Sequence, residues 1–173
     1  GIPDNTRLKD GDIISIDIGS CYKGYHGDSA WTYAIGEVPQ STLDLMEATK
    51  ESLFKGLSMV KPGNRLGDVS FAIGDYAHSK GYSVTLDYTG HGVGAKLHED
   101  PSIPNFGEAG KGVRLREGMT LAIEPMVSAG KPEMITMSDG WTVKTADGKL
   151  CAHYEHSVVI TKDGYEILTT LDK

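Results

Sequence analysis

Apolar and polar residues alternate along the first part of the chain. The alternation runs over residues 12–18, stops at Gly19 and returns over residues 29–35, with a loop expected at residues 22–27. A period of two residues places every second side chain on the same face of a strand. The pattern therefore predicts two neighbouring strands, each with one apolar face.

The apolar spacing then lengthens to three or four residues, which is the period of an amphipathic helix. Residues 43–60 predict one helix that ends before Pro62-Gly63. A second predicted helix begins after Asn64, whose side chain could accept free amide protons, and it leaves through Gly81. Two helices are therefore expected to follow the first strands.

The rest of the chain is predicted to consist mainly of short strands. They are expected at residues 82–86, 119–127, 141–145, 149–160 and 165–169. The glycine- and proline-rich segment 89–112 is predicted to be irregular and, at that length, functional. Asp147-Gly148 and Asp163-Gly164 are predicted to join neighbouring strands through tight turns. Two helices with mostly hairpin-linked strands indicate an α+β domain with a largely antiparallel sheet.

Composition limits the possible partners. The 173 residues, 39% of them hydrophobic, suit one buried core and a single domain over residues 1–173. With 17 basic and 24 acidic residues the net charge is -7, and no basic run could follow a phosphate backbone, so nucleic acid is not expected as a partner. No apolar run approaches the roughly 20 residues that span a bilayer, so no membrane partner is expected. The two cysteines lack a Cys-x-x-Cys spacing, which fits a reducing cytoplasm.

Three acidic residues, Asp17, Glu124 and Glu155, stand within apolar strands. Any one of them could be an exposed acid on the solvated face of a half-buried sheet. A buried carboxylate costs several kcal/mol unless a cation pairs with it, and no nearby run of Lys or Arg supplies partners for all of them. Asp28, beyond the first loop, could be brought close to Asp17 by strand pairing. The set indicates a cation site.

A metal centre would supply the missing positive charge. His91 lies within Gly90–Gly94, where bare backbone lets an imidazole approach a site closely. Four carboxylates and one imidazole suit Mn, Fe(II), Co or Zn better than Cu. Two divalent cations would balance four negative ligands. The prediction is a centre of two divalent metal ions held by Asp17, Asp28, His91, Glu124 and Glu155.

Other chemistries find less support in the sequence. The motifs His-Glu-x-x-His of zinc proteases and Gly-x-Ser-x-Gly of serine hydrolases are absent. Gly90–Gly94 lacks the Gly-Lys-Ser/Thr ending of a phosphate-binding loop. Four further histidines are expected to be structural, hydrogen-bonded residues, namely His26, His78, His153 and His156.

Five motifs follow one another in a fixed order along almost the whole chain. They are Asp17-Ile18 with Tyr25–Asp28, Thr89–Gly94 with Leu97–Pro101, Ala122–Val127, Asp139–Val143 and Tyr154–His156. In these motifs the chain resembles the type I methionine aminopeptidases, which have the creatinase-like pita-bread fold. The resemblance implies a cytoplasmic metallo-exopeptidase, a hydrolase that removes the N-terminal methionine from new polypeptides.

The resemblance also implies a role for each metal ligand. Asp17 would bind one metal, and His91 with Glu124 would bind the other. Asp28 and Glu155 would bridge the pair. A hydroxide between the metals would attack the carbonyl after the methionine, and Glu124 would carry a proton from the attacking water to the leaving amine.

Three more residues would contact the substrate by the same resemblance. His98 would donate a hydrogen bond to the substrate amide or its oxyanion. Trp141 would form a wall of the methionine pocket, although it could also be an ordinary core aromatic. Leu97 stands where the family usually has Phe, which would alter the pocket wall and leave the metals in place.

The resembling proteins carry an upstream segment, with two helices and a catalytic histidine, before the position of Gly1. The domain is therefore expected to be incomplete at its N-terminus, and exposed apolar sheet surface is expected to favour self-association. Three alternatives to an active methionine aminopeptidase stay open. They are an inactive fragment, a binding module of the same fold that keeps the metal site, and an Xaa-Pro peptidase of this fold with similar ligands.

Overall fold

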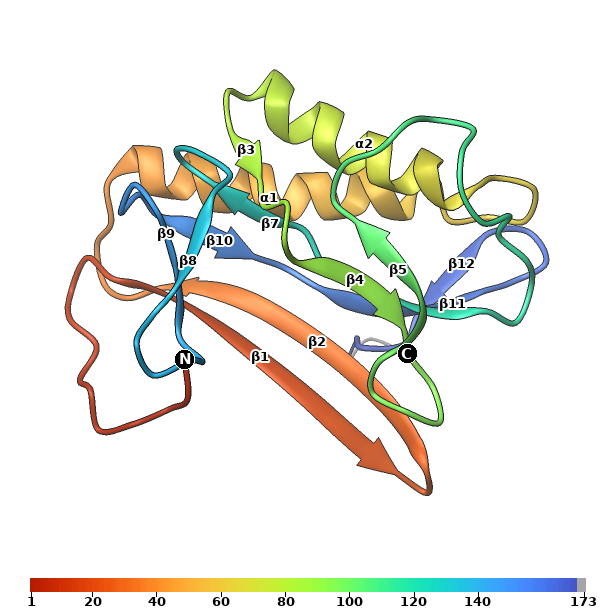
Figure 1. The fold of residues 1–173 in the computed structure, drawn as a ribbon, viewed down its shortest axis with the longest axis horizontal. Coiled ribbons are helices and arrows are strands. Elements are labelled where there is room, and N and C mark those ends of the chain that lie inside the picture. Colours follow the sequence, from red (N-terminus) through yellow and green to blue (C-terminus); the bar gives the residue numbers. More distant parts are fainter. Residues whose placement is uncertain (171–173) are drawn as a thin grey trace.

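The computed structural model describes residues 1–170 and consists of two helices above antiparallel strands (Figure 1). The helices are α1 (Gln40–Leu57) and α2 (Leu66–Ser79). The strands are β1 (Ile13–Tyr22), β2 (Tyr25–Ala34), β3 (Ser83–Val84), β4 (Thr89–Gly92), β5 (Glu99–Pro104), β6 (Thr120–Ile123), β7 (Met126–Ser128), β8 (Met134–Thr136), β9 (Val143–Thr145), β10 (Cys151–His153), β11 (His156–Ile160) and β12 (Tyr165–Ile167). Every strand pair in this part of the chain is antiparallel, so the predicted α+β class is confirmed.

The strands form four groups. A five-stranded sheet has the order β12-β11-β6-β4-β5, and a three-stranded sheet has the order β10-β7-β3. Two hairpins, β1-β2 and β8-β9, complete the set. Figure 1 shows α1 and α2 side by side along one side of the sheets and the long hairpin β1-β2 on the opposite side.

The first hairpin is longer than the sequence pattern predicts. β1 and β2 pair over ten residues each, from Ile13 opposite Ala34 to Tyr22 opposite Tyr25, so the loop predicted at residues 22–27 is wrong. The connection is Lys23-Gly24, with φ values of 51° and 83°. Positive φ at both positions is typical of a type I′ turn, whose twist matches that of the flanking strands. The strands can therefore pair up to the turn.

The start of α2 also differs from its prediction. Asn64 does not accept the free amides, since its Nδ2 donates to the Met59 carbonyl at 2.9 Å. The Arg65 N–H donates instead to Asp68 Oδ2 at 2.7 Å, so the cap is formed from within the first turn. The predicted exit at Gly81 is confirmed by its φ of 83°, which glycine adopts at little cost.

The segment 89–112, predicted to be irregular, contains β4 and β5. Strand β4 approaches both of its neighbours so closely that a Cβ at Gly90 would collide with the Ala122 carbonyl, and one at Gly92 with the Asp100 carbonyl. Glycine, which usually weakens a strand, is required here by the close approach. Gly90 and Gly92 therefore belong to a tightly packed sheet, while residues 93–98 and 105–112 are irregular as predicted.

Strand pairing in the last third of the chain also differs in part from the prediction. The hairpin predicted around Asp147-Gly148 is wrong, because β9 pairs with β8 and β10 pairs with β7. The hairpin around Asp163-Gly164 is confirmed, with β11 paired to β12. Local turn residues indicate where the chain reverses and carry no information on which strand it then meets.

Two strand interruptions lie opposite each other at the centre of the fold. Glu124-Pro125 separates β6 from β7, and Tyr154-Glu155 separates β10 from β11, so the continuous strands predicted at 119–127 and 149–160 are each two strands. β11 pairs with β6 on one side of the interruptions, and β10 pairs with β7 on the other. Proline cannot donate to a ladder, which explains the break after Glu124.

The main core fills the space between the helices and the sheets. Its largest fully buried side chains come from both layers and are Leu45, Leu53, Leu57, Ile73, Ile103, Leu121, Ile123 and Ile160. Burial of a side chain of this size contributes about 1.5–3 kcal/mol, so the core holds the sheets in a defined register. No helix in the described part of the chain is long and apolar enough to cross a membrane.

Candidate metal centre

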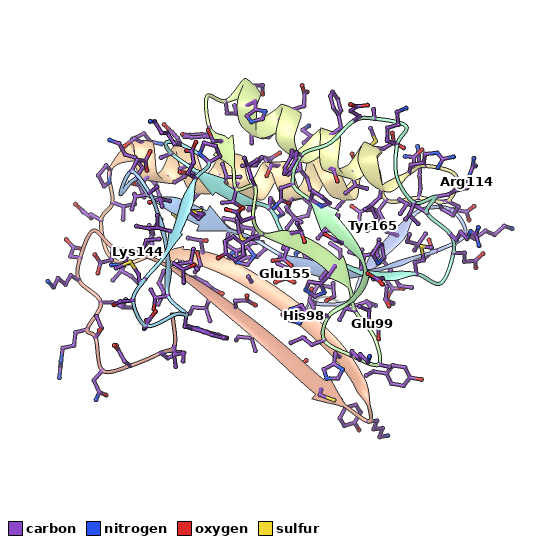
Figure 2. The ribbon with its side chains drawn as sticks, in the orientation of Figure 1. His98, Glu99, Arg114, Lys144, Glu155 and Tyr165 are labelled. Carbon is purple, nitrogen blue, oxygen red and sulfur yellow. The ribbon has the colours of Figure 1, made fainter. Side chains whose placement is uncertain are left out.

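The five predicted ligands come from separate parts of the chain and meet between the hairpin β1-β2 and the five-stranded sheet. Potential ligand atoms lie within 4.8 Å of one another in three overlapping sets. These sets are Asp17, Asp28 and Glu155; His91, Glu124 and Glu155; and Asp28, His91 and His98. Figure 2 labels Glu155 and His98, each of which belongs to a set that includes a hairpin aspartate. The structure therefore brings all five predicted ligands together.

The hairpin places its two aspartates on one face. Asp28 pairs with Gly19, and Asp17 lies two residues before Gly19, so the two carboxylates are diagonal neighbours. Asp28 is fixed to β11, since its N–H donates to Ser157 Oγ at 2.9 Å and the same hydroxyl donates to the Asp28 carbonyl at 2.8 Å. These bonds hold the hairpin against the sheet at the site.

The glutamates lie at the two strand interruptions. Glu155, between β10 and β11, donates its N–H to the Ala30 carbonyl of β2 at 2.8 Å. Glu124 lies directly before Pro125, where β6 leaves the five-stranded sheet. Each glutamate therefore stands where regular pairing stops, and each carboxylate lies at the site instead of on a solvated sheet face.

His91 directs its Nε2 atom toward the carboxylates. Its Nδ1 lies 2.8 Å from the Gly92 carbonyl oxygen, which can only accept, so Nδ1 carries the proton in a neutral ring. The Nε2 atom then has a lone pair 3.3 Å from Glu124 Oε1 and 3.6 Å from Asp28 Oδ2. A metal-binding histidine is commonly oriented in this way, with the other nitrogen donating to a carbonyl.

The four carboxylates are not compensated by basic side chains. Among residues 1–170, no Lys or Arg forms an ion pair with any of them. Glu155 is 1% exposed, and its Oε1 has no hydrogen-bond partner among the described residues. Burial, followed by the charges of Glu124, Asp28 and Asp17, raises the pKa of Glu155 to about 10. A cluster of this kind fits divalent cations, which would neutralise it.

Asp17 shows the same effect more weakly. Its pKa is raised mainly by burial and, to a lesser degree, by the charges of Asp28 and Glu124, while His153 acts in the opposite direction. The direction is opposite to that of a carboxylate in a salt bridge. The donor set of carboxylates and a neutral imidazole therefore fits Mn, Fe(II), Co or Zn.

The three predicted substrate residues lie at different distances from this centre. The exposed His98 ring lies 4.4 Å from the His91 ring, centroid to centroid. Leu97 is half-buried and packs over Gly19, where an added Cβ would lie 3.1 Å from its Cδ1. Trp141 is 67% exposed on the turn between β8 and β9, so it does not pack as a core aromatic. Its role as a pocket wall stays a prediction.

A cavity of about 570 Å³ adjoins the centre. Its lining includes Met126, Met134, Leu150 and Cys151, and burial raises the pKa of the Cys151 thiol to about 11, so the thiol is neutral near pH 7. His153 lines the same cavity and places its Nε2 atom 3.5 Å from Glu124 Oε2. The cavity therefore meets the metal centre at His153.

His153 is the site residue that the sequence reasoning missed. We predicted a structural role for it, but the structure places its imidazole between the cavity and Glu124. The available signal was its position two residues before Glu155, the spacing that puts two side chains on one face of a strand. All four histidines predicted to be structural lie outside the three ligand sets, but His153 faces the predicted ligand Glu124 at 3.5 Å.

Comparisons with known proteins agree with this geometry. Residues 1–162 match the sequence model of metallopeptidase family M24. Methionine aminopeptidase 1 of Bacillus subtilis is 56% identical over 169 residues, which cover 98% of this chain and 68% of the relative. The crystal structure of methionine aminopeptidase from Thermotoga maritima has a TM-score of 0.93 at 53% identity and covers 94% of this chain and 66% of that one.

A prolidase offers a comparison with the Xaa-Pro alternative. The prolidase from Pyrococcus horikoshii has a TM-score of 0.78 at 25% identity, over 98% of this chain and 43% of that one. Both values are lower than for the aminopeptidase from Thermotoga maritima. The chain spans about two thirds of the length of its aminopeptidase relatives and is more similar to them than to this prolidase.

Proposed function

Because the chain belongs to metallopeptidase family M24, we propose that residues 1–173 form a catalytic domain that removes the N-terminal methionine from polypeptides. Membership of this family confirms the pita-bread fold that the sequence motifs indicated. The observation that carries the proposal is the uncompensated carboxylate cluster around the buried Glu155, with the Nε2 atom of His91 directed into it.

We propose two cation positions that share Glu155. One is formed by Asp17, Asp28 and Glu155, and the other by His91, Glu124 and Glu155. Asp28 also approaches His91 to 3.6 Å, which supports its role as a second shared ligand. Divalent cations at these positions would supply the Lewis acidity that a peptide hydrolysis near neutral pH requires.

Glu124 is the proposed proton carrier. One of its carboxylate oxygens faces His91, and the other faces His153 and the cavity. A carboxylate at the boundary between cavity and metal centre can take a proton from the attacking water and return it to the leaving amine. His98, on the exposed side of His91, would donate a hydrogen bond to the substrate carbonyl.

The cavity would hold the methionine side chain. Its volume of about 570 Å³ exceeds the need of one side chain, and the part of its lining formed by Met126, Met134 and Cys151 is apolar and polarisable, whereas Lys144 and Lys149 are polar. Such a wall adapts to an unbranched thioether. Leu97 and Trp141 would contribute from the rim, as the resemblance implies.

A peptidase assay tests the proposal. The chain is incubated with a Met-Ala-Ser peptide and Mn²⁺ or Co²⁺, and free methionine is quantified. Release that exceeds that of Glu124→Gln, and equals that of the exposed control Glu117→Gln, supports the proposal. Bound metal without methionine release would favour the inactive fragment or the binding module, and cleavage restricted to Xaa-Pro peptides would favour the third alternative.

A further inference from the structure

We infer that His153 is a positioning residue for Glu124, donating from Nε2 to the carboxylate and thereby setting how tightly the centre binds metal. The inference deepens the proposed function and rests on it, because Glu124 is taken as a metal ligand. His153 itself would touch neither metal nor scissile bond.

The two imidazoles beside Glu124 are not equivalent. In the proposed centre the Nε2 atom of His91, 3.3 Å from Oε1, would bind a metal ion and have no proton to donate, while His91 Nδ1 donates to the Gly92 carbonyl. It therefore cannot hold the Glu124 carboxylate through a hydrogen bond. His153 Nε2 lies 3.5 Å from Oε2, on the other side of the carboxylate. Of these two rings, His153 is the one that can donate.

The Nε2 atom of His153 needs a partner. It is buried and has no hydrogen-bond partner among residues 1–170, and the whole side chain is 14% exposed. Buried polar atoms without a partner are rare in proteins and costly. Glu124 Oε2 is the acceptor within reach, and a movement of about half an ångström by either side chain would bring the pair to normal hydrogen-bond distance.

The backbone of His153 is rigidly held. Its N–H donates to Thr32 Oγ1 at 2.9 Å, and the same hydroxyl donates to the His153 carbonyl at 2.7 Å. His153 also pairs with Met126, two residues after Glu124. Both neighbouring strands therefore fix the imidazole relative to the carboxylate, which is what a positioning residue requires.

Direct coordination by His153 is a different hypothesis with less support. None of the three sets with ligand atoms within 4.8 Å contains His153 in the described part of the chain. The residue lies outside the ligand shell and touches it at one oxygen of Glu124. Outer partners of this kind orient a ligating carboxylate, and their loss typically costs about 10–100-fold in metal affinity.

Calorimetric titration with Mn²⁺ tests the inference without requiring turnover. Two variants are compared with the wild type: His153→Leu removes the donor, and His153→Gln keeps an N–H donor at similar reach. We expect His153→Leu to weaken Mn²⁺ binding by about 10–100-fold and His153→Gln to restore most of it. The control is His78→Gln, on the exposed face of α2, which should bind as the wild type does.

Melting curves in EDTA establish that each variant folds, and a double-mutant cycle assigns the effect to Glu124. In the Glu124→Gln background, His153→Leu should have little further effect on Mn²⁺ affinity if the two side chains act as a pair. If His153→Leu fails to fold, His153→Gln still tests the inference, because a loss of Mn²⁺ affinity in this variant, which keeps the N–H donor, would overturn it.

Three results would overturn the inference. Unchanged affinity in His153→Leu would make the residue a packing residue. Equal loss in the Leu and Gln variants, with one ion fewer bound, would make it a direct ligand. Loss in the Leu variant that persists in the Glu124→Gln background would remove the link to Glu124. A wild type that binds no Mn²⁺ would instead refute the proposed metal centre itself.

Discussion

We predict that removing the charge of Glu155 increases the free energy of unfolding of the metal-free chain. The carboxyl is almost fully buried, and burial together with three neighbouring carboxylates raises its pKa from 4.5 to about 10. Between these values the folded chain holds a proton that the unfolded chain has released. Stability without metal is therefore lost as pH rises through this window. Glu155→Gln, which has no such proton to take up, should escape this loss.

The expected magnitude follows from the size of the window. Each pH unit between the unfolded and folded pKa values costs about 1.4 kcal/mol. Between about pH 5.5 and pH 8.5 the wild type should lose about 4 kcal/mol that Glu155→Gln retains. With Mn²⁺ bound the order should reverse, because the cations favour the ionised carboxylate that the variant lacks.

Urea unfolding measures this difference. The free energy of unfolding is determined in EDTA for the wild type, Glu155→Gln and Glu117→Gln at several pH values, and then repeated with excess Mn²⁺. The exposed Glu117→Gln is the matched control and should follow the wild type. Since all three chains share the remaining titratable groups, the difference between their pH slopes isolates Glu155.

Two outcomes would refute the reasoning. Parallel pH slopes for the wild type and Glu155→Gln would mean that Glu155 is not held in a cluster of uncompensated charge. A Glu155→Gln variant with the same Mn²⁺-induced stabilisation as the wild type would mean that Glu155 does not bind the cations.

Three further predictions concern metal, catalysis and association. Mn²⁺ at about 100 times its dissociation constant should stabilise the chain by about 2.7 kcal/mol relative to the EDTA-treated chain, which corresponds to a rise in Tm of roughly 5–11 °C. Calorimetric melting curves that coincide with and without Mn²⁺ would contradict this prediction. Glu124→Gln should lower kcat by about 10²–10⁴-fold at saturating Mn²⁺ while some metal stays bound, and an unchanged kcat would remove Glu124 as proton carrier. On the hairpin β1-β2, Ile16, Ile18 and Tyr33 are 44%, 62% and 49% exposed. The chain should therefore self-associate as its concentration rises in sedimentation velocity, and Ile18→Lys should reduce this association; a wild type that stays monomeric at every concentration would refute the prediction.

The candidate site was predictable from sequence to the extent that its signals are local. Acids within apolar strands and a histidine among glycines can be recognised from the sequence alone, because burying an unpaired charge is costly wherever the strand lies. The helical period over residues 43–60 likewise predicted α1, and an exit at Gly81 predicted the end of α2. Both depend on residues a few positions apart.

Strand partners and boundaries could not be obtained in the same way. The glycines of segment 89–112 indicated a loop, yet Gly90 and Gly92 lie in β4, where neighbouring carbonyls leave no space for a Cβ. The sequence pattern predicts Glu124-Pro125 to lie within one continuous strand. Only the antiparallel pairing of β6 with β11 and of β7 with β10 shows that the chain passes here from one sheet to another. Pairing is set by contacts between distant residues, which a local pattern does not contain.

The sequence by itself thus determined the elements and the chemistry of the ligands, since period, charge and side-chain type are properties of neighbouring residues. The tertiary structure alone decided which carboxylates converge, that Glu155 is buried without a partner and that His153 stands beside Glu124. The physical reason is that pKa values and metal affinity depend on distances across strand pairs. Those distances arise only when the hairpin β1-β2 is fixed to β11 and the two strand interruptions meet.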